Sequence, residues 1–416
     1  MKPTRQLDVV IIGGGAAGFF AAIACAEANL HVKVTLLEAG SQPLSKVRIS
    51  GGGRCNVTHH CFDPARLVQN YPRGGKALRG AFSRFQPRDT VNWFQSRGVK
   101  LKTEADGRMF PITDSSETII DCLTTAADKA GVILQTNSTV KAVRKLEEPS
   151  KKQFQIELKK GKILECDRLL IATGSNPSGY RWATDLGHTI KTPVPSLFTL
   201  KIDDPRIKDL AGISVDNVRV TLLLSGKKAL QQTGALLITH WGLSAPAILK
   251  MSAWGARILH ENKYNLSLRI NWLPDRDLES LKQYLTTVKS DYYKKKIINY
   301  CPVELPKRLW LNLLDYLNIN RDKIWAEINK KELNKLVSEL IQGEYQIKGK
   351  GVFKDEFVTC GGVNLKEVDF KTMQSKKCSE LYFAGEVLDI DGITGGFNFQ
   401  SAWTTGWLAG NAMSNL

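Results

Sequence analysis

The sequence contains no stretch that approaches the roughly 20 consecutive apolar residues needed to cross a bilayer. Its first residues lead directly into a strand pattern, without the apolar segment of a secretory signal. We therefore expect a cytoplasmic protein with no membrane partner. The chain has 416 residues, of which 43% are hydrophobic and 24% charged. This is the composition of an ordinary globular protein of about two or three domains.

The eight cysteines form no CxxC pair, and no Cys/His group has the spacing of zinc ligands. The lack of a CxxC pair argues against a dithiol reductase of the thioredoxin-reductase kind. The lack of a zinc-ligand spacing predicts no metal site. Reduced thiols are expected. The sequence also contains a single GxGxxG motif and no internal repeat, so we expect no second Rossmann domain for NAD(P)H.

Acidic residues are outnumbered: 58 Lys and Arg against 41 Asp and Glu give a formal net charge of +17. Such a balance predicts a polyanionic partner, unless the charge is incidental. A second basic stretch, 294–308, lies far from the densest one, 64–103. The candidate RNA-binding residues in the densest segment are Arg66, Arg73, Lys76, Arg79, Arg84 and Arg88.

Aromatic residues are interleaved with these basic residues, namely Tyr71, Phe82, Phe85, Trp93 and Phe94. Basic and aromatic residues together suit phosphate neutralisation combined with base stacking. The aromatics equally fit the core face of amphipathic helices whose arginines face water. Both interpretations remain open from the sequence.

The most informative pattern is a strand, a glycine turn, a helix and a second strand between Leu7 and Glu38. Gly13 makes the tight turn, Gly15 allows a pyrophosphate close to the backbone, and Gly18 allows the helix to pack near the strand. The helix N-terminus then offers free N–H groups to phosphates. Glu38 is expected to accept hydrogen bonds from an adenosine ribose. The full pattern predicts a bound dinucleotide.

A related arrangement occurs near the other end of the chain. An apolar strand leads to Gly385 and Glu386, and a turn at Gly395 and Gly396 precedes a helix. A buried strand in the middle of the sequence ends at the small-residue turn 172–174. Two cofactor motifs at opposite ends indicate one domain built from both ends, with the middle of the chain inserted. This pattern resembles that of FAD-binding flavoproteins.

The loop 46–58 contains three successive glycines within the sequence Ser-Gly-Gly-Gly-Arg-Cys-Asn. The glycines allow a close backbone approach, and Lys46 and Arg54 are expected to compensate phosphates or an anionic reduced flavin. A loop this rich in glycine and polar residues predicts a cofactor contact rather than a simple connection.

Composition predicts the domain boundaries. We expect an FAD-binding domain over 1–191 and 363–416, interrupted by a β-rich domain over 192–274 and 341–362, with a helical subdomain over 275–340. The segment 40–60 is expected to be a loop, and 132–140 a strand.

Six motifs together resemble one family, the BaiN-like (aminoacetone-oxidase-family) FAD-binding flavoproteins. They are the glycine motif, the loop 50–56, Asp-Gly-Arg-Met-Phe-Pro at 106–111, Thr-His-Trp-Gly-Leu-Ser-Ala-Pro-Ala at 239–247, Cys-Gly-Gly-Val at 360–363, and the C-terminal motif 385–400. The resemblance implies an α/β fold with a Rossmann-type FAD-binding domain of the glutathione-reductase-like kind. It also implies an inserted β-barrel-like domain that carries a small helical subdomain.

The glycine turns and this resemblance give one set of expected FAD contacts. They are Gly13, Gly15, Ala16, Ala17, Gly18, Glu38, Ala39, Lys46, Ser50, Gly51, Gly52, Gly53, Arg54, Cys55, Asn56, Val140, Ala172, Thr173, Gly174, Gly385, Glu386, Asp389, Gly395, Gly396, Phe397, Asn398 and Gln400.

The family includes flavoenzymes that form dihydrouridine in ribosomal RNA and others assigned to small molecules such as bile acids. The resemblance therefore implies an FAD-dependent oxidoreductase that reduces a uridine of 23S ribosomal RNA, with NAD(P)H as reductant. An oxidoreductase for a small metabolite and a flavin-binding sensor without turnover are the alternatives. Trp241 and Ala245 depart from the residues common in the family, which leaves the substrate open.

Saturation of uracil needs a hydride at C6 and a proton at C5, so an acid must be positioned. Cys55 is the first candidate because it lies in the glycine loop; the alternative is that it only packs against the flavin. His240 is the second candidate, as a residue that orients the substrate. The sequence does not choose between NADH and NADPH, and it does not fix the oligomeric state.

Overall fold

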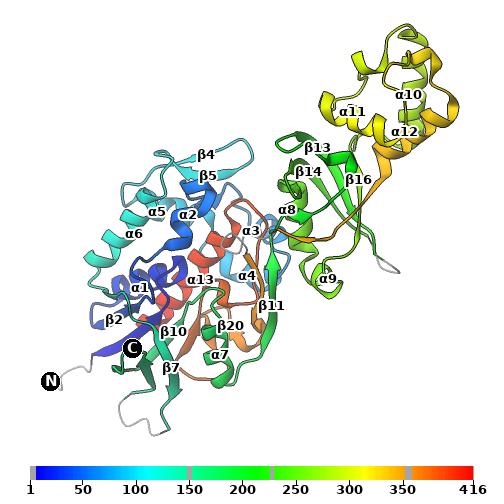
Figure 1. Ribbon diagram of the computed structural model, residues 1–416. Helices are drawn as coiled ribbons and strands as arrows, with labels where there is room; N and C mark the ends of the chain where they lie inside the picture. The colour runs from blue at the N-terminus through cyan, green and yellow to red at the C-terminus, as the bar shows by residue number, and fades with distance from the viewer. Residues whose placement is uncertain (1–5, 148–151, 225–228, 352–357, 416) are drawn as a thin grey trace. The chain divides into compact units, whose positions relative to one another are not determined.

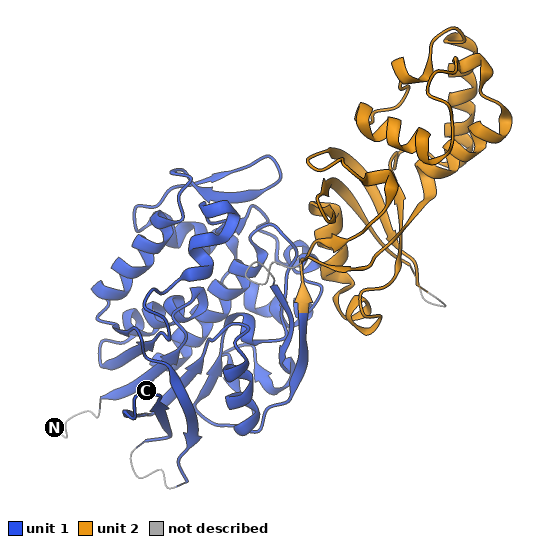
Figure 2. Ribbon diagram, viewed as in Figure 1, with its two compact units in different colours: residues 1–194, 358–416 blue, residues 195–357 orange. Residues whose placement is uncertain are grey.

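The computed structural model describes residues 6–147, 152–224, 229–351 and 358–415. The chain divides into two compact units, which Figure 2 distinguishes by colour: unit 1 consists of residues 1–194 and 358–416, and unit 2 of residues 195–357. The predicted boundaries at 191 and 362 lie near these limits and remain predictions. Residues 358–362, assigned by the sequence to the inserted domain, fall in unit 1, where β19 (Val358–Val363) pairs with β11 (Ile190–Ser196).

Unit 1 is built on a seven-stranded sheet in the order β20-β21-β22-β10-β1-β2-β6. The five strands from β22 to β6 are parallel, and β20 and β21 are antiparallel additions at one edge. The bounds are β1 (Leu7–Ile12), β2 (Val32–Leu37), β6 (Ile133–Gln135), β10 (Arg168–Ile171), β20 (Val368–Asp369), β21 (Gln374–Ser375) and β22 (Leu381–Phe383). The carboxyl ends of the parallel strands therefore meet at one edge, where open α/β sheets bind ligands.

The two ends of the chain meet through helices α1 (Ala16–Ala28) and α13 (Phe397–Ser414), which lie side by side and both contact strands of the sheet (Figure 1). Glycines on α13 allow a close approach: a Cβ at Gly406 would lie 2.6 Å from the Ala17 carbonyl oxygen, and one at Gly410 2.4 Å from that of Ala21. Small residues on both helices thus join the N-terminal and C-terminal segments in one core.

The remaining elements of unit 1 surround this core. Its helices are α2 (Ser45–Gly53), α3 (Pro64–Leu67), α4 (Gly75–Phe82), α5 (Pro87–Gln95), α6 (Glu117–Lys129) and α7 (Pro177–Asp185). Two small sheets contain β3 (Thr58–His59), β5 (Arg108–Pro111) and β4 (Leu101–Thr103), and β7 (Val140–Lys145), β8 (Phe154–Leu158) and β9 (Ile163–Cys166).

Two local predictions were wrong. The segment 40–60 is not only loop, because α2 lies within it; this helix is kinked at Ser50, whose extended ψ of 149° interrupts it before the glycines. The predicted strand 132–140 is limited to β6, and the next strand begins at Val140. Asn137, with φ of +50°, makes the intervening turn that separates the two strands.

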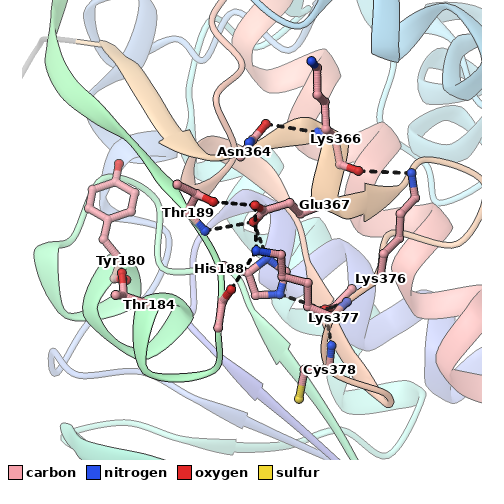
Figure 3. A network of polar contacts seen from close by, with 12 residues as sticks. Tyr180, Thr184, His188, Thr189, Asn364, Lys366, Glu367, Lys376, Lys377 and Cys378 are labelled. Carbon is pink, nitrogen blue, oxygen red and sulfur yellow. Dashed lines mark hydrogen bonds and ion pairs between the residues drawn. The ribbon is translucent and has the colours of Figure 1, made fainter.

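A polar network around the buried His188 fixes the β20–β21 hairpin to the segment that follows α7 (Figure 3). The His188 ring, whose pKa is lowered by burial, lies with Nε2 2.7 Å from Ser375 Oγ and Nδ1 3.3 Å from Glu367 Oε2. Glu367 accepts hydrogen bonds from the Thr189 N–H at 2.8 Å and from the Thr189 hydroxyl, and pairs with Lys377 at 2.9 Å. Burial opposes ionisation of Glu367, but these donors outweigh it and lower its pKa to about 2.

Glu367→Gln is expected to reduce the free energy of unfolding at pH 7 by about 1–2 kcal/mol, because charge-assisted hydrogen bonds are lost. The carboxylate's pKa is lower in the folded state, so its contribution is present above pH about 4.5 and disappears as the pH falls toward 2. Denaturant unfolding from pH 3 to 7 measures this. The exposed Glu165→Gln is the matched control. If the stability difference between the wild type and Glu367→Gln instead grew below pH 4.5, a lowered pKa of Glu367 would be contradicted.

Unit 2 contains an antiparallel seven-stranded sheet in the order β17-β16-β13-β14-β15-β12-β18. Its strands are β12 (Leu200–Lys201), β13 (Ser214–Leu222), β14 (Leu230–Thr239), β15 (Gly242–Ser244), β16 (Ser267–Asn271), β17 (Gly343–Gln346) and β18 (Gly349–Lys350). Within the described part of unit 2, β17 and β18 stand at the two edges of this order, so the barrel-like closure implied by the resemblance is not confirmed.

Five helices accompany this sheet: α8 (Pro246–Trp254), α9 (Ala256–Glu261), α10 (Leu278–Asp291), α11 (Lys307–Tyr316) and α12 (Lys330–Gln342). Helices α10 and α11 lie within the predicted helical subdomain, and α12 extends two residues beyond its predicted end at 340. The buried side chains of these three helices, such as Leu285, Trp310 and Leu336, belong to the same apolar cluster as Val220 of the sheet. The helices and the sheet therefore share one hydrophobic core.

Ala245, which precedes α8, has φ of +76° and ψ of 175°. This region is open almost only to glycine and costs another residue about 1–3 kcal/mol. Ala245→Gly is therefore expected to raise the free energy of unfolding by about 1 kcal/mol, after allowance for glycine's greater freedom in the unfolded chain. Denaturant unfolding measures the change. Ala247→Gly, a buried position inside the same helix, should instead destabilise by about 1 kcal/mol. Equal effects would contradict a strain at Ala245.

Candidate functional site

The glycine motif forms the turn between β1 and α1. Gly13 has φ of +115°, and a Cβ there would lie 2.4 Å from the Ala172 carbonyl oxygen. A Cβ at Gly18 would lie 1.9 Å from the Gly13 carbonyl oxygen. A Cβ at Gly15, in contrast, would meet no atom of the described residues within 4 Å. Two glycines therefore serve close packing, while the third leaves open space before the helix.

The first turn of α1 has neither a capping side chain nor an acidic residue. By comparison, α10 and α12 have capping boxes at their N-termini. The N–H groups at the start of α1, near Ala16 and Ala17, therefore face the open space at Gly15 with a partial positive charge. This arrangement suits a diphosphate.

Glu38 follows β2 at the same edge of the sheet, with Ala39 next to it. Its two carboxylate oxygens accept hydrogen bonds from the Gly14 N–H at 3.0 Å and from the Gly40 N–H at 2.7 Å. These bonds fix the carboxylate beside the glycine turn and leave further lone pairs for hydroxyl donors. The position is consistent with the predicted ribose contact.

The three glycines of segment 46–58 are the last residues of α2, and their backbone departs from helical geometry. Gly51, Gly52 and Gly53 have φ of +58°, +71° and +84°, and all three are exposed. The side chains predicted to compensate phosphates are paired within unit 1: Lys46 Nζ lies 2.5 Å from Glu386 Oε2, and Arg54 Nη1 2.7 Å from Glu104 Oε1. These cations balance acids of the chain itself, so their role toward a cofactor remains a prediction.

Cys55 closes the glycine loop with φ of +59° and has no exposed surface. Burial raises the pKa of its thiol to about 12, with a smaller opposing effect from Ser50. The thiol is therefore neutral at pH 7. A proton donor works best when its pKa lies near the working pH, so this environment favours packing over proton transfer. Its catalytic role stays a prediction.

The turn after β10 comprises Ala172, Thr173 and Gly174. The Thr173 hydroxyl oxygen is buried and has no hydrogen-bond partner among the described residues. A Cβ at Gly174 would lie 3.5 Å from Glu386 Oε2, so this turn lies next to the segment that follows β22. The hydroxyl faces α7, because a Cβ at Gly179 would lie 1.9 Å from it, so a cofactor contact by Thr173 stays a prediction. Val140, at the start of β7, is buried.

The C-terminal motif begins after β22 at Gly385 and ends in the first turn of α13, which lacks a capping side chain and an acidic residue. The Asn56 amide oxygen accepts from the Gly396 N–H at 2.9 Å, which links the glycine loop to the start of α13. Phe397 is buried and stacks on His59 with ring centroids 4.7 Å apart. The two glycine turns therefore meet.

Two predicted contacts in this motif have other partners, and two more remain predictions. The Gln400 side chain, fully buried, accepts from the hydroxyls of Thr58 and Thr90 and donates to that of Thr404. The Asn398 amide binds both backbone groups of Gly392. The sequence offered no signal for these bonds. Asp389 and Gly395 lie in the same connection, and their cofactor contacts remain predictions.

The arrangement fits FAD. An uncapped helix N-terminus, an open glycine position and a fixed acid at the end of β2 match a dinucleotide. The meeting of segment 46–56 with the start of α13 suits the remainder of the cofactor. All these residues belong to unit 1. Tyr180, whose buried hydroxyl also lacks a partner among the described residues, was not found from the sequence.

The aromatic residues of 64–103 belong to the core. Tyr71, Phe82, Phe85 and Phe94 are buried, and Trp93 packs on Phe20 with ring centroids 4.6 Å apart. This supports the amphipathic-helix interpretation and leaves no exposed stacking surface on those four rings. The candidate RNA-binding residues that remain exposed are Arg66, Lys76, Arg79, Arg84 and Arg88.

Arg73 differs from the other candidates. Its guanidinium pairs with Asp391, and the two side chains are 15% and 0% exposed. The pair joins the segment before α4 to the connection that precedes α13. Arg73 therefore has a structural partner, and its RNA contact stays a prediction.

His240 lies in unit 2, at the exposed turn between β14 and β15, next to Trp241. It thus belongs to a different unit from Cys55. Over the described ranges, no group of three or more His, Cys, Asp or Glu is placed to hold a metal ion. No helix of the described chain is long and apolar enough to span a membrane.

Comparison with known proteins supports a flavin site. A family model described as "HI0933-like protein Rossmann domain" matches residues 7–412. The chain is 31% identical over 414 residues to the ribosomal RNA dihydrouridine synthase of Escherichia coli (strain K12), covering 97% of each. It is 30% identical over 410 residues to the 3-dehydro-bile acid delta(4,6)-reductase of Clostridium scindens, covering 97% of this chain and 98% of the relative.

Among solved structures, the 3-ketosteroid-delta4-(5alpha)-dehydrogenase of Rhodococcus jostii RHA1 covers the whole chain with a TM-score of 0.53 and 14% identity, a likeness of fold alone. The predicted BaiN-like resemblance is thus confirmed at the level of the family. The chain belongs to the HI0933-like family and has the Rossmann-like FAD-binding α/β fold of flavin-dependent oxidoreductases.

Proposed function

We propose that this protein reduces a uridine of 23S ribosomal RNA to dihydrouridine. The observation that carries the proposal is the match, over nearly the full length, to a relative named ribosomal RNA dihydrouridine synthase. The formal charge of +17 and the exposed cations of 64–103 are consistent with a polyanionic substrate. Because the proposed substrate is ribosomal RNA, we also propose that the protein acts in the cytoplasm.

The residues of unit 1 are proposed to hold FAD as follows. The first turn of α1 binds the diphosphate, Glu38 the adenosine ribose, and the turns at Thr173 and Gly396 the remaining polar groups. A bound flavin, once reduced, supplies the hydride that saturates the C5–C6 bond of uracil. The chain must then exclude water, orient the base, and deliver one proton to C5.

Two residues are proposed to act on the base: Cys55 as the proton donor and His240 as an orienting residue. Cys55 holds a proton at pH 7, but its burial requires that the uracil reach the glycine loop directly. His240 is exposed and is proposed to orient the base from unit 2. An unpaired or extruded uridine is needed in either case, because a stacked base cannot lie on the flavin.

NAD(P)H is proposed as the reductant that supplies two electrons in each cycle. The single GxGxxG motif serves FAD, so the nicotinamide nucleotide would bind transiently. Anaerobic bleaching of the flavin absorbance by NADH or by NADPH tests this and identifies the preferred nucleotide. If neither bleaches the flavin, another reductant is needed; if no reductant does so, the sensor alternative is favoured.

An oxidoreductase for a small metabolite is the second candidate. The specific observation in its favour is the equally long match to a bile-acid reductase at 30% identity. Salt distinguishes the two candidates: RNA binding that neutralises several phosphates should weaken steeply between about 50 and 200 mM salt, whereas binding of an uncharged metabolite should not.

The decisive experiment is a mass-spectrometric comparison of ribosomal RNA from cells with and without the protein. A gain of two hydrogens on one uridine, which returns with the wild-type gene, supports the proposal. RNA unchanged at every position rejects it and leaves the metabolite alternative. Complementation with Cys55→Ala, and with Cys61→Ala as a control, then tests the acid. Loss of a general acid should slow reduction about 10²–10⁴-fold without loss of flavin.

A further inference from the structure

The helical part of unit 2 exposes the combination of cations and aromatic rings that the sequence pattern predicted for 64–103. After α10, the chain places Tyr292, Tyr293, Lys294, Lys295 and Tyr300 together; we call these residues the Tyr–Lys patch. Tyr293 is 49% exposed, and Lys294 and Lys295 are exposed. The rings of Tyr292 and Tyr300 stack with centroids 4.2 Å apart, and Lys295 Nζ lies about 5 Å from both, at 5.0 and 4.9 Å.

The lysines of the patch are available to an external anion. Lys296, the next residue, pairs with Asp322 at 3.0 Å. In the described structure, neither Lys294 nor Lys295 has an acidic side chain within 4 Å, and their ammonium groups lie instead 5.3 and 5.0 Å from tyrosine rings. Phosphate contacts would therefore not require an existing ion pair to break.

The backbone beneath the patch is held in place. The Trp325 N–H donates to the Lys295 carbonyl at 3.0 Å, and the Ala326 N–H donates to that of Tyr293 at 3.1 Å. The Ile297 N–H donates to the Lys323 carbonyl at 3.0 Å. Trp325 and Ile297 are themselves buried in the core of unit 2. A rigid scaffold lowers the entropy cost of binding to these side chains.

We propose that the Tyr–Lys patch binds single-stranded segments of the RNA substrate. Tyr293 offers an exposed face on which a base stacks, and Lys294 and Lys295 neutralise adjacent phosphates. The inference rests on the proposed function, which it extends by naming a docking surface in unit 2. Stacked tyrosines with short-range cations favour RNA over an anionic membrane, because the patch lacks the large aliphatic side chains that insert into lipid.

The test measures binding of the full-length, FAD-loaded protein to a fluorescent oligouridylate and to deproteinised 23S ribosomal RNA over a salt series. Tyr293→Ala should weaken binding about 5- to 150-fold, the equivalent of one lost stacking contact, and Tyr293→Phe should restore it. Lys294→Gln with Lys295→Gln should reduce the slope of log affinity against log salt by about 1.4 for a single strand.

Lys330→Gln with Lys331→Gln is the matched control, because both lysines are exposed at the start of α12 in the same unit and the net charge changes equally. Unchanged flavin absorbance and melting temperature confirm that each variant folds. The inference is overturned if the patch variants bind RNA as the wild type does, if both lysine pairs have equal effects, or if only binding to phosphatidylserine vesicles changes.

The same proteins separate this inference from the proposed function. If the wild type adds two hydrogens to a uridine while the patch variants bind RNA normally, the patch inference fails and the function stands. If the patch variants lose RNA binding but the wild type reduces no uridine, the RNA-binding patch stands and the proposed reaction fails.

Discussion

Gly15→Ala is expected to yield a folded but colourless protein. Gly15 precedes α1 with φ of −92° and ψ of −170°, a conformation that alanine adopts readily. The added methyl group meets no atom of the described residues within 4 Å, so the free energy of unfolding without cofactor should change by less than about 0.5 kcal/mol. The methyl group instead occupies the open space where we propose the FAD diphosphate, which should weaken FAD binding by about 100-fold, or about 2.7 kcal/mol.

Titration of the apoprotein with FAD, followed by flavin fluorescence and absorbance, measures this effect. Gly80→Ala is the matched control, since a Cβ at Gly80 in α4 also meets no described atom within 4 Å but lies outside the glycine motif. Gly18→Ala should differ from both variants by destabilising the fold, because its Cβ would lie 1.9 Å from a carbonyl oxygen. Wild-type FAD affinity in Gly15→Ala would refute the diphosphate assignment.

Arg73→Ala is expected to lower the free energy of unfolding by about 3–5 kcal/mol, because it leaves the fully buried Asp391 carboxylate without its guanidinium partner. The loss should be larger than the effect of any exposed arginine in 64–103. Since the pair joins the segment before α4 to the connection before α13, FAD affinity should also fall. Urea unfolding of the apoprotein and FAD titration measure the two effects.

Arg66→Ala provides the comparison, because the Arg66 side chain is 82% exposed and its contact with Asp63 is 3.8 Å long. It should change stability by less than about 0.5 kcal/mol. If Arg66 contacts a phosphate, its removal should reduce the salt slope of RNA binding by about 0.7–0.9. A stable Arg73→Ala protein with that reduced slope would instead restore Arg73 as an RNA contact and exclude the structural role.

The nature of the cofactor site was accessible from the sequence because it depends on local rules. A tight turn after a buried strand, a close helix approach and an acid at the end of the next strand each require particular residues at fixed spacing, as at Gly13, Gly18 and Glu38. The motif at Gly396 was predicted by the same kind of rule, whereas the turn at Thr173 was predicted from its resemblance to flavoproteins. No comparable spacing rule identifies which side chains of a motif have partners elsewhere in the fold.

Partners distant in the sequence account for what the motifs missed. Gln400 belongs to a cofactor motif, yet Thr58 and Thr90, more than 300 positions away, bind its side chain. Arg73 lies in a basic segment, yet it pairs with Asp391 across 318 positions. Such contacts form only when the two ends of the chain pack through α1 and α13.

The sequence by itself determined the strand–turn–helix cofactor motif, the family and the excess of positive charge, because composition and short-range spacing encode them. The tertiary structure alone decided which charged and aromatic side chains reach solvent. Packing buried four of the aromatic rings of 64–103 and left Tyr293 exposed beside Lys294. The two segments have similar basic and aromatic composition, but their residues have different three-dimensional surroundings. Burial depends on those surroundings, so composition does not predict it.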